Sequence, residues 1–195
     1  MIKVDLGAGL LNQNKIDRYK RYLGEGYDPS QYIGVDCRDV KGVDKSCDFE
    51  SEKLPFEDNS VEEIITVHTL EHVRNLEHII KECHRILKPQ GLLKIWVPHC
   101  HSTIAFAEMG HVRFFATSTL DTFDVEGKEP DYPFYGYLFE KIQVKLQICR
   151  NQFKIRWQDK ILENFINKKQ RRREGFLKGL PYKDWEIFFK LKKSV

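Results

Sequence analysis

The feature that most constrains the fold is the start of the chain, where the run Ile2–Leu6 is followed by Gly7 and Gly9. The β-branched and apolar residues of this run predict a buried strand. Two glycines one residue apart let the backbone turn sharply and leave no side chain between it and a ligand. In open α/β sheets, ligands bind just beyond the carboxyl ends of the strands. This stretch predicts a ligand-binding turn, or a tight turn that binds nothing.

Strand-like and helix-like segments then alternate along the first half of the chain. We expect strands at Ile2–Leu6, Tyr32–Asp36, Ser46–Phe49, Val61–Val67 and Gly91–Pro98, and helices around Lys15–Leu23 and after Asn75. Apolar residues recur at helical spacing after Asn75, and Pro89 is expected to end that helix. The alternation predicts a doubly wound α/β fold with a mostly parallel sheet and helices on its faces.

The second half of the chain changes character after Pro98. Residues 99–137 are rich in histidine, aromatic residues, glycine and proline, which predicts short helices and loops over the carboxyl edge of the sheet, on the substrate side. Apolar residues alternate in Ile142–Trp157 and Trp185–Leu191, with a basic, helical segment at 159–173 between them. Because no helix-length segment follows Trp185, the last strand is expected to run antiparallel to its neighbours.

Length and composition favour one soluble domain over residues 1–195. Charged residues make up 31% and hydrophobic residues 41%, and we find neither a membrane-length apolar run nor a signal peptide at the N-terminus. The five cysteines are scattered, which predicts reduced thiols and a cytoplasmic protein. Oligomeric state is not predicted.

The net charge of +3 is unevenly distributed. Residues 1–149 carry −6, whereas residues 150–195 carry +9 and include five cations in Lys168–Arg173. Such a run predicts contact with an anionic partner, nucleic acid among them, or a solvated basic helix end. We expect the nearby aromatic residues Trp157, Phe165 and Trp185 in the core rather than stacked on bases.

Acidic and aromatic residues follow the predicted strands. Asp36 is placed to accept hydrogen bonds from both hydroxyls of a ribose, unless it only supports a turn. Asp48 offers an acceptor for an exocyclic amine and Phe49 a ring for an adenine face, although Phe49 also suits the core. Asn12 stands where a dinucleotide fingerprint has its third glycine, and no helix is expected to start tightly after the loop. A nucleoside cofactor without a pyrophosphate therefore fits better than NAD.

Several motifs, in order, resemble the class I S-adenosylmethionine-dependent methyltransferases of the type 11 kind. The matching stretches are Asp5–Gly9, Ile33–Asp36, Leu54–Val61, Leu70–Val73 and Arg85–Gly91. The resemblance implies a seven-stranded sheet with only its last strand antiparallel, S-adenosylmethionine as the cofactor, and His68 beside the methionine part of the cofactor. The predicted cofactor-binding residues are Asp5, Gly7, Ala8, Gly9, Asp36, Cys37, Asp48, Phe49, His68 and His72.

Methyl transfer to an oxygen or nitrogen acceptor is an in-line displacement that needs alignment and, for some acceptors, a base. The candidate bases are His99, His101 and His111, on the substrate side of the predicted sheet. The same three histidines are an alternative metal site, although we predict no metal. The acceptor is not identified by the sequence. The competing hypothesis is a catalytically silent module that binds nucleosides or nucleic acid.

Overall fold

The computed structural model describes residues 1–125, 139–149, 157–179 and 184–194, with only the backbone at residues 171, 176 and 178. Its strands are β1 (Ile2–Leu6), β2 (Ile33–Asp36), β3 (Lys45–Ser46), β4 (Val61–Val67), β5 (Leu87–Pro98), β6 (Phe139–Ile148) and β7 (Trp185–Lys193). Its helices are α1 (Gln13–Leu23), α2 (Leu76–Ile86), α3 (Ile104–Ala107), α4 (Trp157–Asn167) and α5 (Gln170–Arg173). Short 3₁₀ turns lie at Pro29–Gln31, Leu70–His72, Asp121–Phe123 and Glu174–Gly179.

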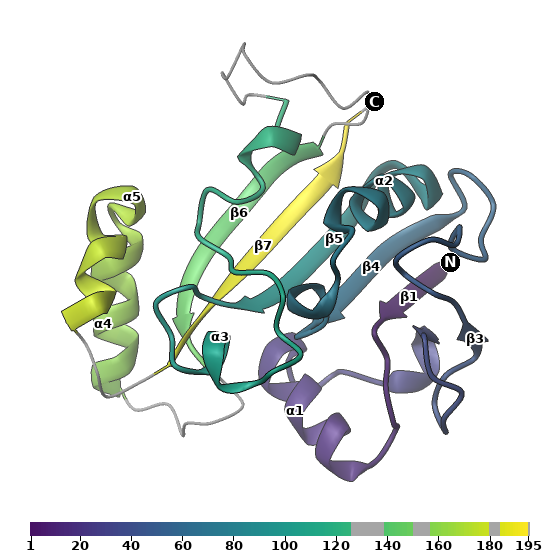
Figure 1. Cartoon of the computed structure of the whole chain (residues 1–195), viewed down its shortest axis with the longest axis horizontal. Coiled ribbons are helices and arrows are strands. Elements are labelled where there is room, and N and C mark those ends of the chain that lie inside the picture. The colour runs from purple at the N-terminus through teal and green to yellow at the C-terminus, as the bar shows by residue number, and fades with distance from the viewer. Residues whose placement is uncertain (126–138, 150–156, 180–183, 195) are drawn as a thin grey trace.

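The strands form one seven-stranded sheet in the order β3-β2-β1-β4-β5-β7-β6 (Figure 1). Strands β1 to β5 are mutually parallel, whereas β7 runs antiparallel to both β5 and β6. The sequence-based prediction of a doubly wound, mostly parallel sheet with an antiparallel last strand is confirmed. The carboxyl ends of β1, β2 and β4 meet at one edge, because neighbouring parallel strands end on the same side.

The two longest helices of the first half cover opposite faces of the sheet. Ile64 belongs to the core cluster that contains the buried residues of α2, whereas its neighbour Ile65 packs in a second cluster with Tyr19 of α1. Successive residues of a strand point to opposite faces, so this division places α1 and α2 on different sides. Buried residues on both faces explain why β4 reads as a nearly continuous apolar run.

Several element boundaries differ from the sequence prediction. Helix α1 begins at Gln13, closer to the glycine turn than expected, because the Asn12 side chain accepts from the N–H of Lys15 and caps it. Strand β3 ends at Ser46, because the following residues fold into a turn on the Asp48 side chain. Strand β5 begins at Leu87 rather than Gly91, through a register shift against β4.

Helix α4 packs on the edge strand β6. The Asn167 side chain exchanges hydrogen bonds with the backbone N–H and C=O of Leu146, and Glu163 accepts from the N–H of Ile148. Trp185 is buried as expected, but Trp157 and Phe165 are exposed at 69% and 50%, so the prediction that all three aromatic residues lie in the core is wrong for two of them. The two exposed rings lie on α4, whose packed face instead presents Leu162, Glu163 and Ile166.

Parts of the predicted segments lie outside the described residues. This applies to residues 126–137 of the substrate-side segment and to residues 150–156 of the alternating stretch. The predicted basic helix is described in full as backbone and consists of α4, a turn at residues 168–169, and α5. None of the described helices combines the length and apolar character needed to span a lipid bilayer.

Candidate functional site

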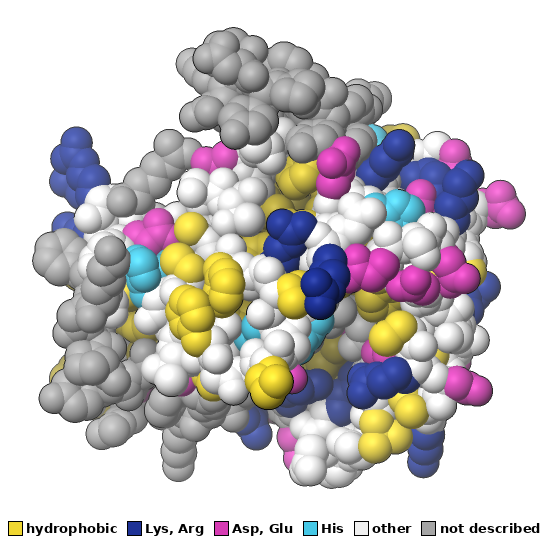
Figure 2. All heavy atoms as spheres, in the orientation of Figure 1, with side chains coloured by type: hydrophobic (Ala, Val, Ile, Leu, Met, Phe, Trp, Pro, Cys, Tyr) yellow, Lys and Arg dark blue, Asp and Glu magenta, His cyan; other side chains and the backbone are white. Residues whose placement is uncertain are grey.

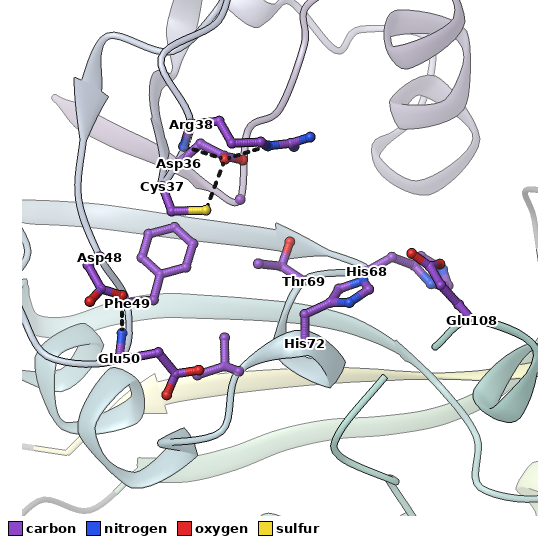
Figure 3. Close-up of a pocket in the computed structure, with 12 residues that line it drawn as sticks. Asp36, Cys37, Arg38, Asp48, Phe49, Glu50, His68, Thr69, His72 and Glu108 are labelled. Atoms are coloured by element: carbon purple, nitrogen blue, oxygen red, sulfur yellow. Dashed lines mark hydrogen bonds and ion pairs between the residues drawn. The ribbon is translucent and has the colours of Figure 1, made fainter. Parts of the chain in front are cut away.

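Two adjoining cavities open at the carboxyl ends of β1, β2 and β4. The smaller has a volume of about 400 Å³ and the larger about 650 Å³. They share the lining residues Gly7, Arg38, His68, His72 and Glu108 and so form one continuous depression. Figure 3 shows Asp36 and Phe49 toward one end of the smaller cavity and His68 and Glu108 toward the other. The combined depression is large enough to hold a nucleoside-sized ligand.

The glycine turn after β1 forms the wall common to both cavities. Gly7 and Gly9 have φ angles of +81° and +58°, in the left-handed region that favours glycine. The N–H groups of Gly7 and Ala8 donate to the carbonyl of Val35 at 2.8 and 3.0 Å, which ties the turn to β2. A Cβ at Gly7 would lie 2.0 Å from Oγ1 of Thr69, so only glycine fits there.

Asp36 ends β2 directly beside that turn. Its Oδ2 accepts from the N–H of Gly9 at 2.8 Å, and its Oδ1 accepts from the N–H and Nε of Arg38. Burial by itself raises the pKa of this carboxyl, but the hydrogen bonds from Arg38 and Gly9 hold the pKa below its ordinary value. An ionised carboxylate has about four acceptor positions, so Oδ2 keeps one for a ligand hydroxyl.

Cys37, Asp48 and Phe49 line the smaller cavity with Asp36. The Asp48 carboxylate accepts from the N–H of Glu50 and the hydroxyl of Ser51, so it mainly holds its own turn. Phe49 is almost fully buried and belongs to the core cluster while its ring borders the cavity. The two readings of Phe49 from the sequence, core residue and cavity wall, are therefore compatible.

His68 follows β4 and lies between two buried carboxylates. Its Nε2 is 3.0 Å from Oε2 of Glu186, and its Nδ1 is 3.2 Å from Oε1 of Glu71. Tyr22 donates its hydroxyl proton to the same Glu186 oxygen. Burial lowers the pKa of His68, but the contacts with Cys149, Glu186 and Glu71 outweigh it and raise the pKa well above its ordinary value. His68 therefore lines both cavities as a positively charged side chain.

The larger cavity extends from the glycine turn toward the segment after β5. Ile104, Ala107, Glu108 and His111 of that segment line it, opposite Glu71 and His72. Outside this lining, Phe106 and Phe114 stack with their ring centroids 4.6 Å apart and remain exposed, as does Met109. Figure 2 shows apolar side chains gathered on this face, over the position of α3. The rim therefore offers apolar surface beside polar groups.

The structure brings only one of the three candidate bases to the cavities. His111 lines the larger cavity, whereas His99 and His101 belong to neither lining. His99 is fully buried; its Nε2 lies 2.7 Å from Oε1 of Glu174, and its Nδ1 accepts from the N–H of His101. Both nitrogens of His99 are thus engaged, which disfavours it as a base and as a metal ligand. His101 is exposed on the far side of that pair.

Asp5, one of the predicted cofactor-binding residues, also lies outside both linings. It is buried, with Oδ2 2.7 Å from Nζ of Lys15 and Oδ1 3.0 Å from the hydroxyl of Tyr19. Desolvation raises its pKa above the ordinary value, against the lowering effect of Lys15. Asp5 therefore fastens α1 to β1 beneath the glycine turn.

A family model for a methyltransferase domain matches residues 4–95 of the chain. This span includes Gly7, Asp36, Phe49 and His68, which line the smaller cavity at or after the ends of the four strands β1 to β4. Residues 4–95 of this chain are therefore similar to the methyltransferase domain family.

Solved structures share the fold of this chain at low sequence identity. They include the methyltransferase bound to the Trm112 activator of Haloferax volcanii (17% identity over 100% of this chain and 83% of that chain, TM-score 0.54). The chain is also similar to YcgJ from Bacillus subtilis (16% identity over 99% of this chain and 92% of that chain, TM-score 0.55). A further similar structure is an S-adenosylmethionine-dependent methyltransferase from Archaeoglobus fulgidus (15% identity over 98% of this chain and 85% of that chain, TM-score 0.55). No curated protein matches the sequence.

Sequence reasoning missed several residues that line the two cavities. Arg18 of α1 and Arg38 after β2 both border the larger cavity, and the buried Nε of Arg18 has no hydrogen-bond partner. Glu71 was visible only as part of the Leu70–Val73 motif, and Glu108 carried no signal. Helical spacing alone does not tell which face of α1 meets the sheet edge, so Arg18 needed the tertiary structure.

Proposed function

We propose that this protein transfers the methyl group of S-adenosylmethionine to an oxygen or nitrogen acceptor held in the larger cavity. The observation that supports it most is the position of Asp36 beside the glycine turn, since two strand ends then share one cavity. In this proposal the ribose hydroxyls bind Asp36, and the adenine ring lies against Phe49 in the smaller cavity. Cys37 and Asp48 complete the adenosine end.

The methionine part of the cofactor then extends over His68 into the larger cavity. Its carboxylate is expected near Arg18, whose unpaired buried Nε is a donor without an acceptor. Its ammonium group needs an acceptor other than Asp5, which is bonded to Lys15 and Tyr19. The backbone carbonyl groups of the glycine turn and Glu71 are the acceptors of this region.

Once both substrates are bound, the reaction is a displacement at carbon. The acceptor atom forms a bond to the methyl carbon, while the carbon–sulfur bond breaks and its electron pair remains on sulfur. The cofactor is already activated, so the protein mainly aligns the three atoms and excludes water. Of the predicted bases, His111 alone is positioned to contact an acceptor.

The acceptor and the basic segment stay predictions. The edge strand β6 lies three strand spacings, or about 14 Å, from β4. Helix α5 follows α4, which packs on this edge strand. An extended anionic acceptor such as nucleic acid spans that distance more readily than a small molecule does. The apolar rim at Phe106 and Phe114 favours an acceptor that also has an apolar part. A cytoplasmic location is likewise a prediction.

Calorimetry with S-adenosylmethionine tests the proposal directly. We expect Asp36→Ala to weaken binding by about 1–3 kcal/mol, the value of hydrogen bonds to a charged group. Asp39→Ala, which changes an exposed acid three residues away, serves as the matched control and should bind like the wild type. Equal affinity of the Asp36→Ala protein and the wild type would refute the assignment.

Transfer of a tritiated methyl group into fractionated cell extract tests catalysis. The proposal predicts label in at least one protein, nucleic-acid, lipid or small-molecule fraction, dependent on the wild-type chain. Cofactor binding without label in any fraction would favour the silent binding module instead. No comparison with known proteins supports that alternative.

A further inference from the structure

Glu71 is a buried carboxylate whose oxygens have no hydrogen-bond partner. Its side chain is 1% exposed, and both Oε1 and Oε2 lack a partner in the structure. The nearest cation is His68, whose Nδ1 lies 3.2 Å from Oε1 in an ion pair that does not have hydrogen-bond geometry. Oε2 is left without any compensating group. A buried acceptor of this kind is costly unless something else binds it.

Two histidines present a ring nitrogen to this carboxylate. Nδ1 of His72 lies 3.1 Å from the carbonyl oxygen of Gly110, and Nδ1 of His111 lies 3.2 Å from that of Ala105. A carbonyl oxygen only accepts, so each Nδ1 carries the hydrogen and each Nε2 keeps its lone pair in the neutral ring. Histidines that bind metals in proteins are oriented in this way, by donating their second ring N–H to a carbonyl or carboxylate.

The three side chains lie within coordination reach of one point. One ligand atom each from Glu71, His72 and His111 lies within 4.8 Å of the other two, and Nε2 of His111 is 4.0 Å from Oε1 of Glu71. Two ligand atoms that are each about 2 Å from a zinc ion are roughly 3–4 Å apart. Small side-chain adjustments therefore suffice to bring all three onto one ion.

The backbone holds the two ligand-bearing segments together. Val112 and Arg113 both donate their N–H groups to the carbonyl of Glu71, at 2.8 and 3.0 Å. A Cβ at Gly110 would lie 3.1 Å from Nδ1 of His72, so the glycine lets this loop approach the ring closely. The three side chains are thus positioned by contacts that exist before any ion binds.

We propose that Glu71, His72 and His111 bind a divalent transition-metal ion at the acceptor end of the larger cavity. Two imidazoles and one carboxylate suit zinc, cobalt, nickel or ferrous iron rather than magnesium or calcium, which prefer oxygen ligands. Three protein ligands leave further positions open toward the cavity that these residues line. Glu108, whose Oε2 is 3.4 Å from Nε2 of His111, is an exposed acid beside the same point.

The role of the ion toward the acceptor rests on the proposed function, whereas metal binding itself does not. A hydroxyl of the acceptor that binds the ion releases its proton to solvent more readily. Its oxygen then bonds to the methyl carbon, and the electron pair of the broken carbon–sulfur bond stays on sulfur. With its Nε2 on the metal, His111 acts as a ligand, and the ion takes the place of a general base.

A second group of metal-type ligands, His68, Cys149 and Glu186, is a weaker candidate. Both ring nitrogens of His68 already face carboxylates, and Tyr22 donates to the Glu186 oxygen next to it. That group is closed by its own hydrogen bonds, whereas Glu71 has unused acceptor positions. The alternative drawn from the sequence, with His99 and His101, lacks a free nitrogen on His99.

The test uses the purified 195-residue chain, stripped with a chelator and titrated with zinc and then cobalt. We expect one equivalent of zinc per chain, and visible absorption of bound cobalt. His72→Ala changes an exposed residue and should weaken zinc binding at least tenfold, as should His111→Ala, whereas His101→Ala should bind like the wild type. Failure of the wild type to bind stoichiometric zinc would overturn the proposal, as would binding that is lost in His101→Ala or unchanged in His72→Ala.

The same samples separate this proposal from the proposed function. Asp36→Ala should lose affinity for S-adenosylmethionine and keep its zinc, whereas His111→Ala should lose zinc and still bind the cofactor in metal-free buffer. If the wild type binds zinc but not the cofactor, the metal site is supported and the proposed function is refuted. If it binds the cofactor but not zinc, the metal site is refuted and the proposed function is supported.

Discussion

Nε2 of His99 lies 2.7 Å from Oε1 of Glu174, a residue 75 positions later in the chain. Glu174 also accepts from the N–H and the hydroxyl of Thr117, both at 2.8 Å. One carboxylate thus joins the end of β5, the segment after it and the turn after α5. A histidine that the sequence suggested as a base is in fact part of a buried anchor for the second half of the chain.

This anchor predicts an acid-dependent loss of stability. Burial by itself raises the pKa of Glu174, but the hydrogen bonds from His99 and Thr117 outweigh it and lower the pKa to about 2. Because the folded pKa lies below that of an unfolded glutamate, about 4.3, the stabilisation is complete above that pH and is lost as the pH falls toward 2. Glu174→Gln should therefore lower the free energy of unfolding by about 1–3 kcal/mol at pH 7 and by less at pH 3.

Urea unfolding of Glu174→Gln and the wild type at pH 7, 5 and 3 measures this difference. Glu57→Gln, which changes an exposed glutamate, is the control for a general effect of charge. A difference between Glu174→Gln and the wild type that is the same at all three pH values would contradict the assignment.

The glycine turn predicts a sharp contrast between two glycine substitutions. Gly7→Ala places a Cβ against the Thr69 side chain at a φ of +81°, so we expect the free energy of unfolding to fall by about 2–4 kcal/mol and cofactor binding to be lost. Gly26→Ala places its Cβ in open space and should change neither. Thermal melting and calorimetry of both proteins check this, and a stable Gly7→Ala protein that binds cofactor would rule out the described turn.

Removal of the Arg85 side chain, on α2, should lower the free energy of unfolding strongly. Its guanidinium donates to Glu82, to Asp58 and to the carbonyls of Leu54 and Phe56, which fixes the connector before β4. Arg85→Ala leaves the buried Glu82 carboxylate without its main partner, so unfolding should become easier by about 3 kcal/mol. Denaturant unfolding should show a much smaller change for Lys88→Ala, whose ion pair is exposed.

The position of Arg18 predicts that its removal affects binding of S-adenosylhomocysteine but not of 5′-methylthioadenosine, a related nucleoside without the amino-acid part. Arg18→Ala should weaken S-adenosylhomocysteine binding about tenfold or more, because a charged hydrogen bond to the carboxylate is lost. Binding of 5′-methylthioadenosine, which has no carboxylate, should not change. Calorimetry with both compounds measures the two affinities, and an equal loss for both would show that Arg18 acts on the fold rather than on the carboxylate.

The fold followed closely from local patterns. Val61–Val67 and the helix after Asn75 have the predicted type and nearly the predicted ends, because burial on both faces and a capped amphipathic face each leave a clear periodicity. The start of β5 at Leu87 was missed, because its pairing with Val61 depends on a register shift against another strand. The periodicity of a single strand does not reveal how that strand pairs with its neighbour.

The residues at strand ends were also accessible from the sequence. Gly7, Gly9, Asp36, Phe49 and His68 were placed at one sheet edge, and the structure brings them to two adjoining cavities. Asp5 and His99 had the right residue type beside the right strands, yet their partners Lys15 and Glu174 turn them into structural anchors. Those partners come from other elements, so residue type and spacing did not reveal them.

The types of the elements, the mostly parallel sheet and the glycine turn thus came from short-range information, because backbone conformation and periodic burial are local properties of the chain. The choice among polar residues was made by tertiary contacts. Glu71, His72 and His111 meet only because the loop after α3 returns to the 3₁₀ turn that follows β4 and bonds to the backbone carbonyl of Glu71. Which carboxylate is paired and which is left open depends on residues that are distant in sequence, and this distinction separates an anchor from a site.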